Sequence, residues 1–327
     1  MKIMKKHASH DDGVQPYWGL KDIPDLSNKT FLITGATNTY GRLIIRAIYA
    51  NNGSVIMVDE AQQAGYDLIQ SLKETIVSTG TLQFRQLDLS DTNAIQKFAA
   101  DLQNEIVQLD VLINNASIKK LERRQVNTEG VETHFQYNFF GPFVLTNLLL
   151  PLLQMGENPR IVNVSAPLPA YANLKLNDLQ LENNYSNQRA YLQSKLATQM
   201  VTFYLQNISE AQMLGVKVMT AHAGIHRNFL APATMNQSSL TRFVRSVINP
   251  LIGTNETGVL PILFAAIDEH AKGGALYTPA GFLHSQGRPQ ATRPIAAALD
   301  KQRQSELWVT ASELAGFSSW ASMANSF

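Results

Sequence analysis

Short apolar runs alternate with segments of helical period from residue 30 onward, and this alternation constrains the fold more than any other feature of the chain. The runs are continuously apolar, which is typical of strands that are buried on both faces of a parallel sheet. We expect strands at residues 30–34, 54–58, 82–87, 111–114, 160–165 and 217–221.

The segments between these runs carry apolar residues three or four positions apart, as amphipathic helices do. We expect helices at residues 41–52, 61–79, 92–106, 129–153 and 188–206, the fourth of them ended by Pro151 and Gly156. Strands that alternate with such helices predict an α/β fold, a single doubly wound parallel sheet with helices on both faces. Ligands of such sheets bind at the carboxyl ends of the strands.

The domain organisation follows from the same pattern. A length of 327 residues would allow two domains, but no linker interrupts the alternation. We expect an N-terminal extension at residues 1–27 and one domain at 28–288, with a lid near 229–248. Residues 289–327 are expected to form a C-terminal helical tail.

Composition excludes several functions. The 27 Lys and Arg residues against 26 Asp and Glu give a net charge of +1, without the basic excess that nucleic-acid binding requires. The absence of cysteine removes thiolate chemistry, and no apolar stretch is long enough to span a membrane. His222 and His226 are four apart, but Gly224 between them and the lack of a third ligand argue against a metal site. We therefore expect a cytoplasmic protein without a membrane span, a metal or a nucleic-acid partner.

The turn after the first strand carries two glycines, Gly35 and Gly41, at the start of a helix. Glycines let backbone N–H groups approach a pyrophosphate at a helix N-terminus. Asp59 follows the second strand, 18 residues after Gly41. A carboxylate there can accept both ribose hydroxyls of NAD and repels the 2′-phosphate of NADP, so NAD is the expected cofactor and NADP the less favoured one. The alternative for Asp59 is a helix cap.

Three motifs in order resemble the short-chain dehydrogenase/reductase family, and its retinol-dehydrogenase-like branch in particular. They are Thr34-Gly35 to Gly41, Asn114-Asn115-Ala116 and Tyr191-Leu-Gln-Ser-Lys195. The resemblance covers roughly residues 28–285 and implies a Rossmann fold.

The resemblance implies a role for the Tyr191–Lys195 pair. The two residues are four apart, so they share one helix face. A nearby ammonium would lower the phenol's pKa from its ordinary value near ~10 and make Tyr191 a general acid or base. Asn138 matches the family asparagine that holds a water for proton relay, and Ser165 is a further catalytic candidate beside the expected substrate-polarising position. The resemblance and the turn together predict these cofactor contacts: Gly35, Thr37, Thr39, Tyr40, Gly41, Asp59, Asp88, Leu89, Asn115, Ala116, Tyr191, Lys195, Gly224 and Ile225.

Four positions depart from the family pattern. Thr39 replaces the middle glycine of the first turn, Ser117 replaces the glycine of Asn-Asn-Ala-Gly, and Ala223 replaces a proline. The fourth is Ala166, which stands where the family has its substrate-polarising serine, with Ser165 next to it. Side chains alternate along a strand, so Ser165 needs a bulge or a register shift to replace that serine.

Three functions remain open at this point, and one of them is an interaction protein that binds no nucleotide, for which NAD(H) would give no protection in a thermal shift. The other two bind a dinucleotide. The first is an oxidoreductase that transfers a hydride between a nicotinamide cofactor and a carbonyl or alcohol, with Tyr191 and Lys195 at the centre. The second is a catalytically impaired NAD(P)-binding module with a regulatory or interaction role. Candidate pocket walls lie at residues 118–124, 167–174 and 229–240. The last of them is apolar, as are Leu168, Tyr171 and Leu174, which favours a hydrophobic substrate, with core packing as the alternative. The helix around Asn138 could mediate a homodimer or pack on the sheet.

Overall fold

The computed structural model describes residues 18–119, 121–224, 254–281 and 287–317. One eight-stranded sheet runs through these residues in the order β3-β2-β1-β4-β5-β6-β7-β8. Strands β1 to β7 are parallel to their neighbours, and β8 is antiparallel to β7. The strands are Thr30–Thr34 (β1), Ser54–Asp59 (β2), Leu82–Gln86 (β3), Val111–Asn114 (β4), Arg160–Val164 (β5), Lys217–Ala221 (β6), Leu276–Pro279 (β7) and Pro289–Thr292 (β8).

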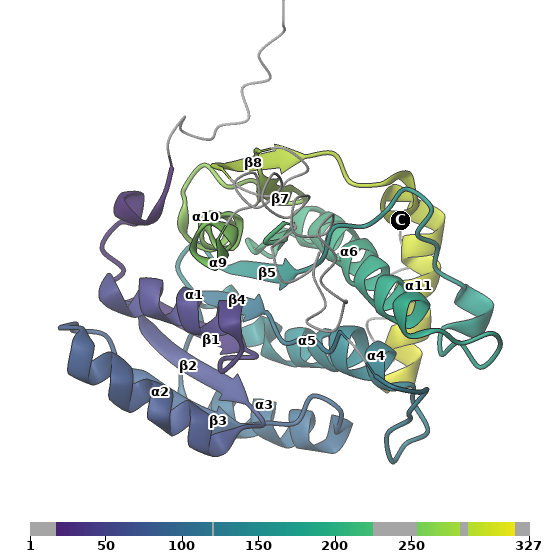
Figure 1. The fold of residues 1–327 in the computed structure, drawn as a ribbon, viewed down its shortest axis with the longest axis horizontal. Helices are drawn as coiled ribbons and strands as arrows, with labels where there is room; N and C mark the ends of the chain where they lie inside the picture. Colours follow the sequence, from purple (N-terminus) through teal and green to yellow (C-terminus); the bar gives the residue numbers. More distant parts are fainter. Residues whose placement is uncertain (1–17, 120, 225–253, 282–286, 318–327) are drawn as a thin grey trace, which may run out of the picture.

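Helices cover both faces of this sheet (Figure 1), so the predicted α/β doubly wound architecture is confirmed. One core cluster joins the sheet to α3, α5, α6 and α11, and the other joins it to α1, α2 and α10. The helices are Thr39–Ala50 (α1), Gln62–Thr75 (α2), Thr92–Glu105 (α3), Thr133–Phe135 (α4), Gly141–Gln154 (α5), Asn187–Ala211 (α6), Asn255–Gly258 (α9), Leu260–Ile267 (α10) and Lys301–Leu314 (α11).

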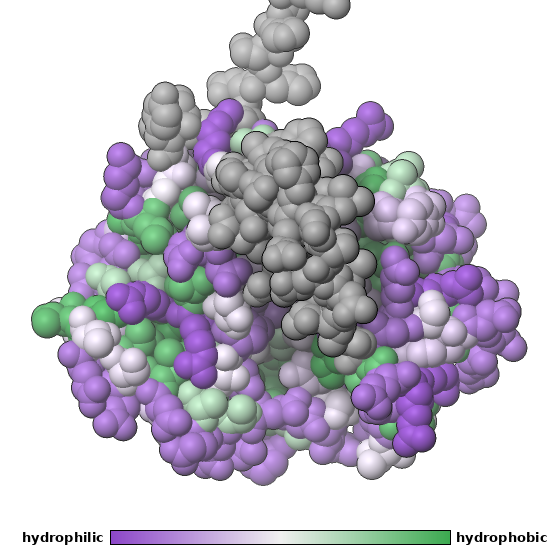
Figure 2. All heavy atoms as spheres, viewed as in Figure 1, coloured by the Kyte–Doolittle hydropathy of each residue, from purple (hydrophilic) through white to green (hydrophobic). Residues whose placement is uncertain are grey.

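Alternating side chains of a single strand divide between these two clusters. On β1, Leu32 belongs to the first cluster, whereas Phe31 and Ile33 belong to the second. Because successive strand residues point to opposite faces, a continuously apolar run fills both cores at once. Polar residues predominate on the face shown in Figure 2.

The helix expected at residues 129–153 is the largest correction to the predicted elements. It begins only at Thr133, passes through a π-helical turn at Gln136–Phe140 and continues as α5 to Gln154. Pro151 lies inside α5 and does not end it, because the helix continues to Gln154. The apolar side chains of this helix are buried within the protein, as expected if the helix packs on the sheet and does not mediate a dimer. They are those of Phe139, Phe140, Leu149 and Leu150.

The two ends of the described chain pack on the domain. Trp18 is buried against Phe264, with ring centroids 5.3 Å apart in an edge-to-face arrangement. Residues 289–292, expected to begin a helical tail, instead form strand β8 on the sheet edge. Trp308 on α11 is fully buried and packs on Phe143 and Tyr204. The expected lid at 229–248 lies outside the described residues.

Candidate active site

The turn between β1 and α1 is closed so tightly that its glycines cannot be replaced without movement. Gly35 has φ +64°, and a Cβ built on it would lie 2.7 Å from Ala116 Cα. A Cβ on Gly41 would lie 2.2 Å from the Gly35 carbonyl oxygen. Asn38 caps α1 by accepting a hydrogen bond from the Gly41 N–H at 2.8 Å. This turn presents the N-terminus of α1 to the carboxyl edge of the sheet, where an anionic group is stabilised.

Asn115 holds this turn to the end of β4. Its side-chain amide donates to the carbonyl oxygens of Thr34 and Gly35, both at 3.0 Å. The Thr34 hydroxyl accepts from the Asn115 and Ala116 N–H groups at 3.1 and 3.2 Å. Asn115 and Ala116 were predicted to contact a cofactor, and the structure shows them shaping the turn that would carry it.

Asp59 at the end of β2 joins the same turn from the other side. One carboxylate oxygen accepts from the Thr37 N–H at 2.9 Å, and the other accepts from the Ala61 N–H at 3.2 Å. Asp59 bonds only the N–H of Ala61, the N-cap residue of α2, and no side chain caps the first turn of that helix, so the alternative role of Asp59 as a helix cap is not confirmed. Asp59 also occupies the N–H of Thr37, a residue that was expected to contact the cofactor. Because each carboxylate oxygen has a second lone pair, both can still accept a hydroxyl.

The close approach at Gly41 makes a testable prediction. We expect Gly41→Ala to weaken dinucleotide binding and to lower the free energy of unfolding by about 1–3 kcal/mol, because the first turn of α1 must move away from Gly35. Thermal unfolding and fluorescence titration with NADH measure the two effects. Gly65→Ala is the matched control: its Cβ would meet the Phe84 ring at 2.2 Å, away from the site. The control should lose stability and keep its affinity for NADH, and equal affinities for the two variants would contradict the prediction.

The remaining residues predicted to contact the cofactor differ in how far the structure exposes them. Asp88 is exposed and its carboxylate accepts from the Ser90 N–H at 2.7 Å, whereas the Leu89 side chain is buried in the core. Gly224 has φ +81° and its N–H donates to Nδ1 of His222 at 3.0 Å. Ile225 and His226 lie outside the described residues.

A cavity of about 390 Å³ opens where these strand ends meet. It brings together residues from the first turn, the β4 loop, the end of β5, α6, the end of β6 and α9, which lie far apart in the sequence. Its lining consists of Asn38, Thr39, Tyr40, Asn115, Ser117, Lys119, Val164, Ser165, Ala166, Pro167, Tyr191, Lys195, Ala223, Gly224 and Asn255.

Tyr191 and Lys195 both reach this cavity from α6. Lys195 is 2% exposed, and its side-chain amino group donates to the Val164 carbonyl oxygen at 3.0 Å. Burial, together with the charge of Lys119, lowers the pKa of Lys195 to about 7. Burial raises the pKa of Tyr191 to about 12, with Ser117 acting in the opposite direction. The sequence-based expectation of a lowered phenol pKa is therefore wrong, because removal from water outweighs the favourable contacts of the phenolate. The phenol holds its proton at neutral pH.

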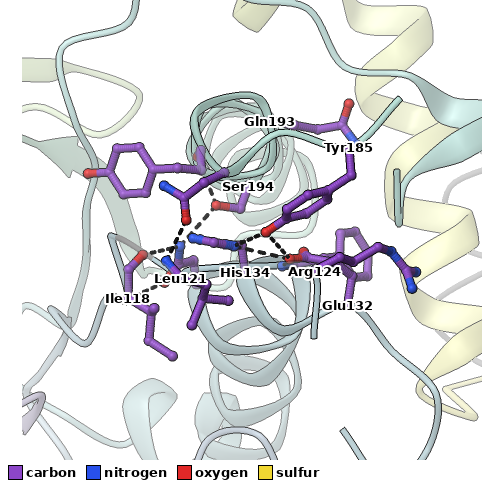
Figure 3. A network of polar contacts seen from close by, with 12 residues as sticks. Ile118, Leu121, Arg124, Glu132, His134, Tyr185, Gln193 and Ser194 are labelled. Carbon is purple, nitrogen blue, oxygen red and sulfur yellow. Dashed lines mark hydrogen bonds and ion pairs between the residues drawn. The ribbon is translucent and has the colours of Figure 1, made fainter. Parts of the chain in front are cut away.

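Asn138 joins the β4 loop to α6 from the π-helical turn. Its side-chain oxygen accepts from the Ile118 N–H at 2.7 Å, and its amide donates to the Ile118 carbonyl at 2.9 Å and to the Ser194 hydroxyl at 3.1 Å (Figure 3). Both ends of the Asn138 side chain are thus used within the protein. A π-helical turn inserts one residue into a helix and re-aims its side chains, which places Asn138 between the two segments.

A second buried network precedes this turn. Glu132 and His134 are almost fully buried and interact at 3.0 Å, and the Tyr185 hydroxyl lies 3.4–3.5 Å from both (Figure 3). The second carboxylate oxygen of Glu132 caps α4 by accepting from the Phe135 N–H at 2.7 Å. These bonds fix where the helical segment begins and therefore where Asn138 points.

The two serines near the cavity differ in what they contact. The Ser165 hydroxyl donates to the Lys195 carbonyl at 3.4 Å and accepts from the Gln199 amide at 3.1 Å, so it is engaged with α6. Ala166, next to it, presents only a methyl group to the cavity. Ser117 lines the cavity from the β4 loop, and Lys119 lies two residues further on. The sequence had marked Ser117 only as a departure from the family pattern and had included Lys119 only as part of a candidate substrate wall at residues 118–124.

Only some residues of the expected substrate walls line the cavity. Pro167 and Lys119 line the cavity, whereas Leu174 is fully buried in the core and Tyr171 is 74% exposed. Residues 229–240 lie outside the described part of the chain. Within the described residues, no cluster of three potential metal ligands occurs, and no helix there is long and apolar enough to cross a membrane.

The class of protein follows from three features together. They are a doubly wound sheet, a glycine turn at the N-terminus of its first helix and a tyrosine–lysine pair at the strand ends, as in dinucleotide-binding oxidoreductases. The family model for short chain dehydrogenases matches residues 29–239, more than half of the chain. The chain belongs to the short-chain dehydrogenase/reductase family.

Curated relatives and solved structures agree with this assignment. The chain is 32% identical over 244 residues to retinol dehydrogenase 12 of Homo sapiens, covering 75% of each protein. It is 28% identical over 307 residues to polyprenol dehydrogenase of Danio rerio, covering 91% of this chain and 90% of the relative. The structure of an uncharacterized protein from Mycobacterium paratuberculosis superposes with a TM-score of 0.73 at 27% identity, covering 92% of this chain and 98% of the other. Pseudomonas aeruginosa RhlG, solved as an active-site complex with NADP, shares the fold with a TM-score of 0.53 at 20% identity, covering 80% and 96%.

Proposed function

We propose that this protein reduces a hydrophobic carbonyl compound with a nicotinamide dinucleotide, or oxidises the corresponding alcohol, with Tyr191 as the general acid or base. The observation that carries the proposal is that Tyr191 and Lys195 meet in one cavity beside the glycine turn. When bound, the dinucleotide supplies or accepts the hydride.

The residues present fit a dinucleotide. The N-terminus of α1, closed by Gly35 and Gly41, offers a site for the diphosphate. Lys195 lines the same cavity, where its amino group would hold the ribose of a bound dinucleotide. Tyr191, protonated at neutral pH, can donate its proton to a carbonyl oxygen, which suits the reductive direction.

We propose that NAD is the preferred cofactor because of where Asp59 lies. Its carboxylate is fixed by the Thr37 and Ala61 N–H groups at the end of β2, where a ribose is bound in this fold. A fixed negative charge there repels a 2′-phosphate. Arg42 is the nearby opposing charge, and its guanidinium donates to the Thr37 carbonyl at 2.7 Å.

The Asp59 proposal has a direct test. We expect Asp59→Ala to reduce the ratio of kcat/KM for NADH over NADPH by about tenfold or more, since charges about 4 Å apart repel by ~1–4 kcal/mol depending on exposure. Asp59→Asn separates charge from geometry because it keeps an acceptor for the Thr37 N–H. If both variants keep the wild-type ratio, Asp59 does not select the cofactor.

We propose a hydrophobic substrate on two grounds. Ala166, Pro167 and Ala223 contribute apolar surface to the cavity. Two curated relatives are named for dehydrogenation of retinol and polyprenol, both hydrophobic alcohols. Lys119 on the same cavity wall adds one cation that a purely apolar pocket would lack. The cytoplasmic location and a homodimer stay predictions.

One experiment separates the enzyme from the alternative. Purified protein is incubated with NADH or NADPH and a panel of isoprenoid, aliphatic and aromatic aldehydes and ketones, and oxidation of the dinucleotide is followed at 340 nm. Turnover that is lost in Tyr191→Phe supports the proposal. Tight NADH binding without turnover on the whole panel, in both directions, supports the impaired binding module instead.

A further inference from the structure

The hydroxyl that the family pattern places at the end of β5 is missing from this chain, and a hydroxyl that the pattern lacks stands at the end of β4. These are the positions of Ala166 and Ser117. Both residues line the cavity that contains Tyr191 and Lys195.

The sheet register relates the two positions. β4 and β5 are adjacent parallel strands in which Asn114 pairs with Asn163. Ser117 and Ala166 both follow the last paired position of their strand by three residues. They are therefore equivalent positions at the ends of two neighbouring strands.

The buried Ser117 hydroxyl lies beside the phenol of Tyr191. A hydrogen-bonding contact with Ser117 lowers the pKa of that phenol. The Ser117 Oγ has no other hydrogen-bond partner among the described residues, and a buried hydroxyl that is incompletely satisfied is costly unless a ligand supplies a partner. Ser165, by contrast, has both its donor and an acceptor position used by α6.

The backbone around Ser117 is fixed on both sides. The Ala116 N–H donates to the Thr34 hydroxyl, and both backbone groups of Ile118 are bonded to the Asn138 side chain. A donor held in this way needs little reorganisation when charge develops beside it.

We propose that Ser117 is the catalytic residue that donates a hydrogen bond to the substrate carbonyl oxygen, in place of the serine that Ala166 has replaced. This inference rests on the proposed function. In the reduction, the carbonyl carbon gains a hydride with its electron pair, the C=O π bond breaks, and the oxygen takes the proton of Tyr191. The carbonyl is reduced to an alcohol, and the dinucleotide that gives up the hydride is oxidised. Ser117 transfers no atom and stabilises the negative charge that develops on the oxygen.

Kinetics of three serine variants test the proposal. We expect Ser117→Ala to lower kcat by about 10²–10³-fold, the usual cost of one oxyanion donor, with the Kd for NADH unchanged by fluorescence titration. The double variant S117G/A166S, which restores the family arrangement, should recover most of this loss. Ser312→Ala is the matched control, because Ser312 has a buried hydroxyl without a partner among the described residues but lies on α11 outside the cavity. It should keep wild-type kcat.

A spectroscopic readout is independent of turnover. In protein labelled with [ζ-¹³C]tyrosine and without cofactor, the Tyr191 resonance, assigned with Tyr191→Phe, should shift in Ser117→Ala and stay in place in Ser312→Ala. Wild-type kcat in Ser117→Ala, or a larger loss in Ser165→Ala than in Ser117→Ala, overturns the proposal while the enzyme assignment stands. Absence of turnover in the wild type rejects the proposed function, and an unshifted Tyr191 resonance then also rejects the contact between Ser117 and Tyr191.

Discussion

Tyr191→Phe is expected to lower kcat by about 10²–10⁴-fold, the range that general acid–base catalysis supplies. The variant removes only the hydroxyl that delivers the proton, and the ring remains to fill its place on α6. Burial raises the phenol's pKa to about 12, so at neutral pH the lost group is a proton donor and not a phenolate. The KM for substrate and the Kd for NADH should change much less than kcat.

The control for this experiment is on the same helix. Tyr204 is buried on α6 outside the cavity, and its hydroxyl donates to Ser305 at 3.3 Å. Tyr204→Phe should lose a single hydrogen bond of about 1 kcal/mol and keep wild-type turnover. Steady-state kinetics with NADH and one accepted aldehyde check both variants. Unimpaired turnover in Tyr191→Phe would remove this tyrosine from the mechanism.

Lys195→Met is expected to abolish measurable turnover and, unusually for a site variant, to stabilise the fold. The ammonium of Lys195 is fully enclosed, contacts a carbonyl oxygen at 3.0 Å and pairs with no carboxylate among the described residues. A methionine fills similar volume without the cost of burying a charge. The loss of the bond to the Val164 carbonyl offsets about 1 kcal/mol of this gain.

The pH dependence of this stabilisation has a definite sign. Unfolded Lys195 keeps its proton up to pH ~10.4, whereas folded Lys195 loses it near pH 7. Between these values the unfolded state binds more protons, so wild-type stability rises with pH by ~1.4 kcal/mol per unit from this group. The advantage of Lys195→Met is therefore largest at pH 7 and below and shrinks from pH 7 toward pH 10.

Thermal unfolding of wild type and variant at pH 6.5, 8 and 9.5 measures this difference. Lys97→Met serves as the control because Lys97 forms an exposed i,i+4 pair with Asp101, which contributes little at any of these pH values. A Tm difference for Lys195→Met that is the same at all three pH values, or that grows with pH, contradicts a lowered pKa for the buried lysine.

Much of the architecture could be predicted from the sequence. Continuously apolar runs such as Thr30–Thr34 require burial on both faces, and the amphipathic segments between them supply the cover, so strand and helix periods determine the doubly wound sheet. The turn at Gly35 and the spacing of Tyr191 and Lys195 are also local, because one depends on backbone sterics and the other on helix pitch.

Other features depend on which segments meet in space. The sequence pattern alone gave no sign of the π-helical turn that aims Asn138 at Ile118, because the turn is stabilised by contacts to the β4 loop and α6. Strand β8 pairs with β7, and Trp308 is buried against Phe143 and Tyr204, because of non-local packing. The raised pKa of Tyr191 likewise reflects enclosure by several elements at once.

The sequence by itself determined the class of fold, the glycine turn and the tyrosine–lysine pair, since each depends on residues within one or two neighbouring elements. Only the tertiary structure decided which hydroxyl the cavity offers. Ser165 is bonded to α6, whereas Ser117, on the adjacent strand end, lines the cavity with its hydroxyl beside the phenol of Tyr191. The physical reason is that the direction and the hydrogen-bond partners of a side chain after a strand are set by the neighbouring strands and helices that pack around it.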